Sequence, residues 1–243
     1  MIHEMLRRAL SPHNTRHTIA NAHLGELDLS AKRSKVAILG GMARACLWPR
    51  DNEDYEVWCC NAMWGLASDS QGRFRADRWF ELHPWWTQSV SDMANLQACP
   101  VPVYMLDIHE QAHPNGTPFE VPNALNFPLD RLLALHAHDY FTCTFAYQIA
   151  LAIALGFDEI MLVGLALIEA REALIERPCV EFWCGVAMAQ KIKIVIPGID
   201  GLGQVPLIWS PFRYGFEYGQ EKEWVEKYCE RAVKRIKPGW KSE

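Results

Sequence analysis

The chain has 243 residues, half of them hydrophobic, so it can bury the core of one domain, or of one domain with a small appendage. A formal net charge of -5 and a pI near 6.0 exclude the strongly basic surface that duplex nucleic acid requires, and we expect no such partner. No segment reaches the roughly 18 apolar residues that cross a bilayer, so we expect no membrane partner either.

The first predicted element is an N-terminal arm over residues 1–34. It is polar and carries His3, His13, His17 and His23, whose spacings fit no single helix face. Such spacings argue against a metal site and favour an arm that packs on the surface or on a partner chain. We therefore expect a metal-independent protein.

Cysteine usage predicts a reduced protein. The eight cysteines lie mostly inside apolar runs and form no C-x-x-C pair, which is typical of buried thiols rather than of a zinc site or a redox dithiol. The stretch "MIHEMLRRALSPHNTRH" lacks the apolar segment of a secretory leader. We therefore expect a cytoplasmic location.

Short apolar runs recur after the arm, separated by segments long enough for helices. Runs without polar alternation are typical of strands buried on both faces, and the gaps leave room for crossover helices. The pattern predicts a single α/β domain over residues 35–220, with a mostly parallel sheet, helices on both faces and the first strand inside the sheet. The runs are "KVAIL", "YEVWCC", "RWFEL", "VPVYML", "EIMLVGL" and "KIKIVIP".

The strongest predicted helix is "TCTFAYQIALAIALG", residues 142–156. Thr142 or Thr144 can cap its first turn, and Gly156 can supply a left-handed residue at its end. Because the helix is apolar almost all round, we expect it to be the one that packs deepest against the sheet.

Three further segments complete the predicted organisation. A helix over residues 168–190 should break near Pro178, with that proline in the first turn of a new helix. Residues 107–139 are rich in Pro, Asn and His and predict an irregular, functional excursion over one edge of the sheet. Residues 221–243 predict a basic C-terminal helix.

The first predicted strand ends in a glycine turn. In an open parallel sheet, ligands bind beyond the carboxyl ends of the strands, where backbone N–H groups and a helix N-terminus meet an anion. Gly40 and Gly41 let the backbone approach a ligand, and Arg44 can add a charge to a phosphate. The turn lacks G-x-G-x-x-G, so its spacing leaves open whether it binds a ligand or only joins a strand to a helix.

Polar residues follow the next two predicted strands. Asn61 stands just past "YEVWCC", where it can offer a donor and an acceptor to a base or ribose, although Asn also suits an ordinary turn. His83 stands just past "RWFEL", as a candidate general base or as a turn residue before proline.

A charged segment, "LIEAREALIERPCVEFW", follows the strand at "EIMLVGL". In an α-helix, Glu169, Glu172 and Glu176 share one face by their i, i+3, i+7 spacing. One of these carboxylates is a candidate general base, and Arg177, fixed before Pro178, is a candidate phosphate ligand. A solvated charged helix is the alternative interpretation.

Ten tryptophans are many for this length. Those in or beside loops either stack on a base or sugar ring or bury into a partner, and the sequence leaves both alternatives open. They are Trp48, Trp64, Trp79, Trp85, Trp86 and Trp209.

Four segments together resemble a known family: "VAILGG", "VWCCNAMW", "YFTCTFAYQIALAIALGFDEIMLVGLAL" and "KIKIVIP". They are similar to the Rossmann-like bacterial sialyltransferases and the related MptE-like proteins of the DUF115 type. The chain also resembles a group of tailed-phage proteins that share its Tyr-Phe-Thr and Glu-Arg-Pro segments. The resemblance runs through residues 35–197 and implies a Rossmann-like fold with a cytidine-nucleotide pocket. By position, that pocket falls to Gly40, Gly41, Asn61, Thr142 with Cys143 or Thr144, and the strand end at Gly164.

The chain also departs from that family. The family follows its glycines with Pro-Ser, where this chain has Met42, Ala43 and Arg44, and "GLAL" lacks the acidic residue usual after the later glycine. The family's catalytic histidine lies downstream of that strand, whereas no histidine follows His138 here. We therefore expect the fold and a nucleotide-type pocket, but not sialyl transfer itself.

Together these features predict a nucleotide- or nucleotide-sugar-binding protein that needs no further cofactor. As an enzyme it would be a glycosyl or other group transferase, in which Arg44 and Arg177 stabilise the leaving phosphate and His83, Glu169 or Glu172 takes the proton. The alternative is a non-catalytic, phage-encoded protein of the host cytoplasm. Such a protein would sequester a nucleotide or bind a partner, either a phage protein or a second copy of itself.

Overall fold

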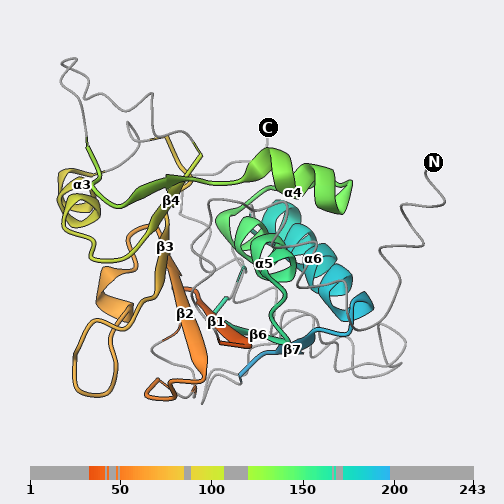
Figure 1. Ribbon diagram of the computed structural model, residues 1–243, viewed down its shortest axis with the longest axis horizontal. Coiled ribbons are helices and arrows are strands. Elements are labelled where there is room, and N and C mark those ends of the chain that lie inside the picture. The colour runs from red at the N-terminus through yellow and green to blue at the C-terminus, as the bar shows by residue number, and fades with distance from the viewer. Residues whose placement is uncertain are drawn as a thin grey trace, which may run out of the picture.

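The structure is a computed structural model, and it describes residues 33–41, 43, 48, 50–84, 89–106, 120–165, 167 and 172–197. Within these ranges the chain forms one sheet of seven strands, and every neighbouring pair is parallel (Figure 1). The predicted α/β class is confirmed, and the first strand lies inside the sheet as expected. The strands are β1 (Lys35–Leu39), β2 (Tyr55–Cys60), β3 (Arg78–Phe80), β4 (Val103–Met105), β5 (Ala124–Asn126), β6 (Glu159–Val163) and β7 (Lys193–Val195).

The order of the strands, β5-β4-β3-β2-β1-β6-β7, reverses direction at β1. From β1 the chain adds β2 to β5 one after another on one side, and it then returns to place β6 on the other side of β1. A Rossmann-like sheet has such a switch point, and ligands bind in the crevice beyond the strand ends there. The topology therefore singles out the turns that follow β1 and β6.

Both faces of the sheet are buried, which explains why its strands are apolar without alternation. All six residues of β2 are buried. Trp58 and Cys60 pack into the core on one face, and Val57 and Cys59 pack into the core on the other.

Three helices cover the first face: α4 (Leu129–His136), α5 (Thr144–Leu155) and α6 (Arg177–Ala189) (Figure 1). Helix α5 buries nine of its twelve residues, so the prediction that it packs deepest is confirmed. It ends as expected at Gly156, which adopts a left-handed φ of 78°.

The start of α5 differs from the expectation. Cys143 holds the N-cap position, and no side chain caps the first turn. The Thr142 hydroxyl instead donates to the Ile175 carbonyl at 3.0 Å, and Thr144 is already the first helical residue. The predicted capping by Thr142 or Thr144 is wrong because a tertiary hydrogen bond takes the Thr142 hydroxyl.

Helix α3 (Val90–Gln97) and the short 3₁₀ helix η2 (Trp64–Leu66) pack on the second face. Leu96 of α3 is buried in this core. The helix begins at Ser89, whose hydroxyl accepts the Asp92 backbone N–H. The prediction of helices on both faces is confirmed, although α3 itself is not predicted from the sequence.

The predicted irregular excursion over residues 107–139 is only partly correct. Its described part contains the edge strand β5 and helix α4. Strand β5 escapes prediction because it has three residues, none of them fully buried, so it forms no apolar run.

The helix predicted over residues 168–190 starts, in its described part, as a π-helix (Glu172–Glu176) that runs directly into α6. Pro178 lies in the first turn of α6, as predicted. The expected break is thus a change of helix type. Glu172–Glu176 is therefore π-helical rather than α-helical, and Glu169 lies outside the described residues, so the shared face of Glu169, Glu172 and Glu176 stays a prediction.

Several predicted segments lie outside the described residues. The arm over residues 1–34 is described only at residues 33 and 34, the domain predicted to residue 220 is described to residue 197, and the helix predicted over residues 221–243 is not described. Among the helices that are described, none has the length and apolar character to cross a membrane. The described cysteines are free thiols, and all but Cys143 are buried, in line with the prediction.

Candidate functional site

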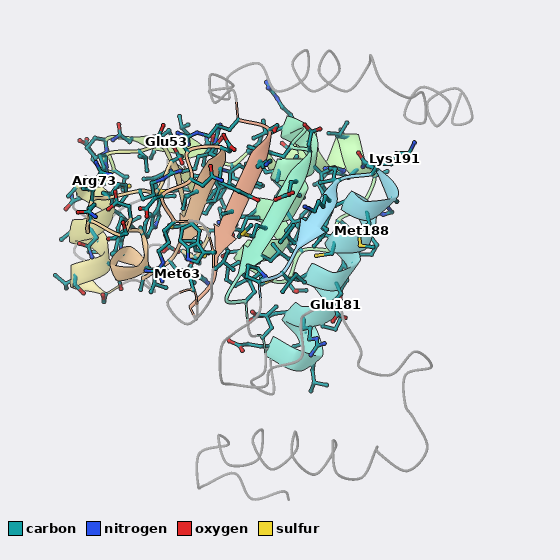
Figure 2. All side chains as sticks on the ribbon, turned by 90° about the horizontal axis from the view of Figure 1, so that it is seen from below. Glu53, Met63, Arg73, Glu181, Met188 and Lys191 are labelled. Carbon is teal, nitrogen blue, oxygen red and sulfur yellow. The ribbon has the colours of Figure 1, made fainter. Side chains whose placement is uncertain are left out.

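The candidate site lies at the edge of the sheet where the parallel strands end. Figure 2 shows that Met63, which follows β2, and Glu181 of α6 lie toward this side of the molecule. Glu53, which precedes β2, and Lys191, which precedes β7, lie toward the opposite side. Polar residues that follow β1, β2, β3 and β6 are therefore brought to one edge.

Gly40 and Gly164 meet at the switch point between β1 and β6. The Gly40 N–H donates to the Val163 carbonyl at 2.7 Å, and a Cβ on Gly40 would lie 2.6 Å from the Gly164 carbonyl oxygen. Gly164 has a φ of 70°, which favours glycine. The two turns are in direct backbone contact, so Gly40 and Gly164 are both required by the fold.

Gly41 differs from its neighbour. It is exposed, and a Cβ built on it would meet no atom of the described residues within 4 Å. The backbone at Gly41 is therefore open to an approaching ligand, while Gly40 supports the turn. Arg44, the predicted charge beside this turn, lies outside the described residues.

Asn61 follows β2 in the left-handed conformation, with a φ of 52°. Its backbone N–H donates to the Phe80 carbonyl at 3.0 Å, which fixes the turn to β3. Its side-chain Oδ1 is buried and has no hydrogen-bond partner among the described residues. Burying an acceptor without a donor destabilises the folded state by about 1–3 kcal/mol. A donor from outside the described residues would remove this cost.

Gln148 of α5 is a second buried amide near the end of β2, and it was not predicted. Its side chain is fully buried, and Nε2 donates to the Cys59 carbonyl at 3.5 Å. Its Oε1 has no partner within the described part of the chain. The available signal was a lone Gln inside the apolar stretch "TFAYQIALAIAL".

His83 follows β3 and contacts Glu81, which the sequence analysis also missed. The Glu81 side chain is 1% exposed, whereas the His83 side chain is 53% exposed. Glu81 Oε1 lies 2.9 Å from His83 Nδ1 and accepts the His83 backbone N–H at 3.2 Å. The available signal was a carboxylate at the end of the apolar run "RWFEL", two residues before the histidine.

Cys143 and Thr144 lie at the start of α5, where Thr144 is buried. Burial raises the pKa of the Cys143 thiol to about 12, although the backbone N–H groups of Ala146 and Phe145 lower it and the nearby Glu176 raises it further. The thiol is therefore neutral at physiological pH and is a poor nucleophile.

The π-helix and the start of α6 lie beside this end of α5, because Thr142 bonds to Ile175. Glu172 is half-buried in the π-helix. Arg177 Nε donates to Glu181 Oε1 at 2.7 Å, which places the predicted phosphate ligand in an ion pair on its own helix. Glu169 lies outside the described residues.

The tryptophans divide between the core and segments that are not described. Trp79 is fully buried in β3, and Trp64 stacks on it with ring centroids 3.6 Å apart. Trp48 packs against the same core. These three rings are used in packing, while Trp85, Trp86 and Trp209 lie outside the described residues.

The arrangement combines an open backbone turn, two buried amide acceptors and a carboxylate–imidazole pair. Such groups can bind a polar ligand through its hydrogen-bond donors and can accept a proton. Within the described ranges, no three histidine, cysteine or acidic side chains gather into a set of metal ligands.

Comparison with known proteins shows likeness to solved structures at low identity. No protein-family model matches the chain, and no curated protein matches it in sequence. The monofunctional α-2,3-sialyltransferase Cst-I from Campylobacter jejuni is 14% identical, with a TM-score of 0.49, over 86% of this chain and 98% of that one. The sialyltransferase CstII from Campylobacter jejuni, solved with cytidine-5'-monophosphate, is 18% identical, with a TM-score of 0.45, over 73% of this chain and 88% of that one. At identities and TM-scores this low, the ligand of this chain must be inferred from its own residues.

Proposed function

We propose that the carboxyl edge of the sheet binds a nucleotide or nucleotide-sugar, and that the chain transfers a group from this donor to an acceptor. The observation that carries the proposal is the buried Oδ1 of Asn61, which has no hydrogen-bond partner among the described residues and lies beside the switch point of the sheet. A ligand N–H or O–H supplies the donor that this oxygen lacks.

The phosphate end of the ligand belongs at the turn after β1. The exposed Gly41 backbone lets a phosphate approach, and Gly40 and Gly164 hold the turn in place. The base or ribose then extends toward Asn61. The sequence resemblance described above implies a cytidine nucleotide, so CMP is the first ligand to test.

Arg44 and Arg177 are the proposed stabilisers of the leaving phosphate. The Arg177 guanidinium pairs with Glu181 through Nε at the start of α6, and a guanidinium binds phosphate through a planar fork of N–H donors. Charge that develops on the leaving oxygen is stabilised most when such donors are positioned in advance. Proton removal from the acceptor falls to His83, Glu169 or Glu172.

The test of this proposal is equilibrium dialysis of the full chain against CMP, UMP, AMP, GMP and CMP- and UDP-activated sugars. Asn61→Gly keeps the left-handed backbone and removes the amide, so it should weaken binding by about tenfold, the equivalent of one hydrogen bond.

Asn52→Gly also removes an Asn side chain, but before β2 at the opposite edge, where its Oδ1 accepts the Asp54 N–H, and should leave binding unchanged. Absence of binding by every ligand in the panel, or equal loss in both variants, would refute the proposed site.

A second candidate function is a non-catalytic binding protein, phage-encoded as the sequence resemblance allows. The exposed apolar side chains of Leu174 and Ile175, 79% and 47% exposed on the π-helix, favour contact with a partner protein. Nucleotide binding without turnover of any sugar nucleotide, together with a stable oligomer in light scattering, would favour this function over the transferase.

A further inference from the structure

Glu81 is a buried carboxylate in the first residue after β3. Its backbone N–H donates to the Tyr104 carbonyl at 2.9 Å, which holds the residue in the sheet even though β3 has ended. Its side chain is 1% exposed. A buried carboxylate is costly unless hydrogen bonds compensate it, and here His83 provides two.

The same contacts bear on the tautomer of the His83 ring, that is, on which of its two nitrogens carries the proton. An ionised Glu81 carboxylate can only accept hydrogen bonds, so in that state Nδ1, 2.9 Å from Glu81 Oε1, is the ring nitrogen that carries the proton. In the neutral ring Nε2 is then the basic nitrogen. The backbone N–H of His83 bonds to the same oxygen, so one carboxylate atom fixes both the chain and the ring.

The neighbouring groups keep this pair beside the proposed ligand. Asn61 bonds through its N–H to Phe80, the residue before Glu81, so the ends of β2 and β3 adjoin. Cys60, the last residue of β2, is the titratable neighbour of Glu81 on the adjoining strand. Burial raises the pKa of its thiol well above the ordinary value, so this neighbour stays neutral and adds no charge.

We propose that His83 and Glu81 form the proton-accepting unit of this site, with His83 Nε2 as the general base and Glu81 as the positioning residue. The inference rests on the proposed transferase function and adds a residue that the sequence analysis did not contain. A base held by a buried carboxylate is the arrangement that general-base catalysis requires, since the carboxylate fixes the tautomer and stabilises the imidazolium that forms.

The transfer step moves one proton and exchanges one carbon–oxygen bond for another. The acceptor hydroxyl gives its proton to His83 Nε2 as its oxygen forms a bond to the transferred carbon. The bond from that carbon to the phosphate oxygen breaks, and the electron pair leaves with the nucleotide phosphate. The imidazolium, still bonded through Nδ1–H to Glu81, later releases the Nε2 proton to solvent.

The experiment measures three quantities on the full chain: CMP binding by dialysis, turnover of a CMP-activated sugar from pH 5 to 9, and the pKa of the His83 ring by NMR. His83→Ala should lower turnover by about 10²–10⁴-fold with little change in CMP affinity. His138→Ala, which removes an exposed histidine before α5, is the matched control and should change none of the three quantities.

The Glu81→Gln variant distinguishes an effect of Glu81 on the His83 ring from a general effect on folding. Loss of the carboxylate should lower the His83 pKa, move the rising limb of the pH–rate profile to lower pH and reduce kcat more than it raises KM. Glu81→Asp, which keeps the charge, should restore part of the pKa and of the rate.

Two results would overturn the inference: turnover that survives His83→Ala, or a His83 pKa that does not change in Glu81→Gln. If wild-type protein binds no nucleotide, the proposed function fails and the transfer step fails with it. The NMR titration still decides, independently, whether Glu81 controls His83.

Discussion

The amino and carboxyl edges of the sheet differ in how completely their buried polar side chains are paired. At the amino edge, Glu159 accepts from the Tyr55 hydroxyl and pairs with Lys193 Nζ at 2.8 Å. Nearby, Asp77 pairs with Arg33 at 2.6 Å and Arg75 at 2.8 Å. Glu159 and Asp77 are thus both bound by side chains of the chain itself.

The carboxyl edge lacks such complete pairing. The buried oxygens of Asn61 and Gln148 have no partner among the described residues, and the Glu81–His83 pair ends in a half-exposed ring. Glu56, the second residue of β2, also has one buried oxygen without a partner among the described residues, but its other oxygen accepts from Arg78 and Trp58. The comparison supports our proposal that the carboxyl edge binds a ligand, whereas the amino edge stabilises the fold.

The largest expected effect on stability comes from the switch point. Gly40→Ala puts a Cβ 2.6 Å from a backbone carbonyl that cannot easily move, so the free energy of unfolding should fall by about 1–3 kcal/mol. The Cβ of Gly41→Ala meets no atom of the described residues within 4 Å, so this variant should change the free energy of unfolding by less than about 0.5 kcal/mol. Urea titration of both variants measures the difference, and equal losses would contradict the contact between the two turns.

A smaller effect is expected at the amino edge. Burial alone would raise the pKa of Glu159, but hydrogen bonds from Lys193 and Tyr55 outweigh it and lower the pKa. Because the folded-state pKa is depressed, this stabilisation is present above the unfolded pKa and is lost as the pH falls through the folded one.

Lys193→Met should therefore reduce stability at pH 7 and make it less sensitive to acid. Lys193 is 69% exposed, so solvent screening limits the loss to about 0.5–1 kcal/mol. Unfolding curves at pH 3 and pH 7 measure it, and nucleotide binding should not change. Weaker nucleotide binding by this variant would contradict the claim that the amino edge contributes to stability and not to binding.

The strands could be predicted from the sequence because burial on both faces gives apolar runs such as "YEVWCC". Strand β5 could not, because its pairing with β4 comes from the tertiary fold and not from its three residues. Helix α5 was predictable in its interior but not at its start, where a contact with Ile175 from a distant segment takes the Thr142 hydroxyl.

The sequence predicts which residues lie at the candidate site, but not which of their polar atoms lack a partner. The positions of Gly40, Asn61 and His83 follow from the rule that strand ends share an edge. The pairing of Arg177 with Glu181 follows from their i, i+4 spacing. The unpartnered oxygens depend on which donors the fold brings near, and no local pattern encodes that.

Nucleotide binding at the carboxyl edge can be tested directly by an NMR titration of the backbone amides of the full chain with CMP. We expect the largest shift changes at Gly41, Asn61 and the first turn of α5, and none at Glu53 or Lys193. Shift changes confined to the amino edge, or no changes at millimolar CMP and at matched concentrations of UMP, AMP and GMP, would contradict it.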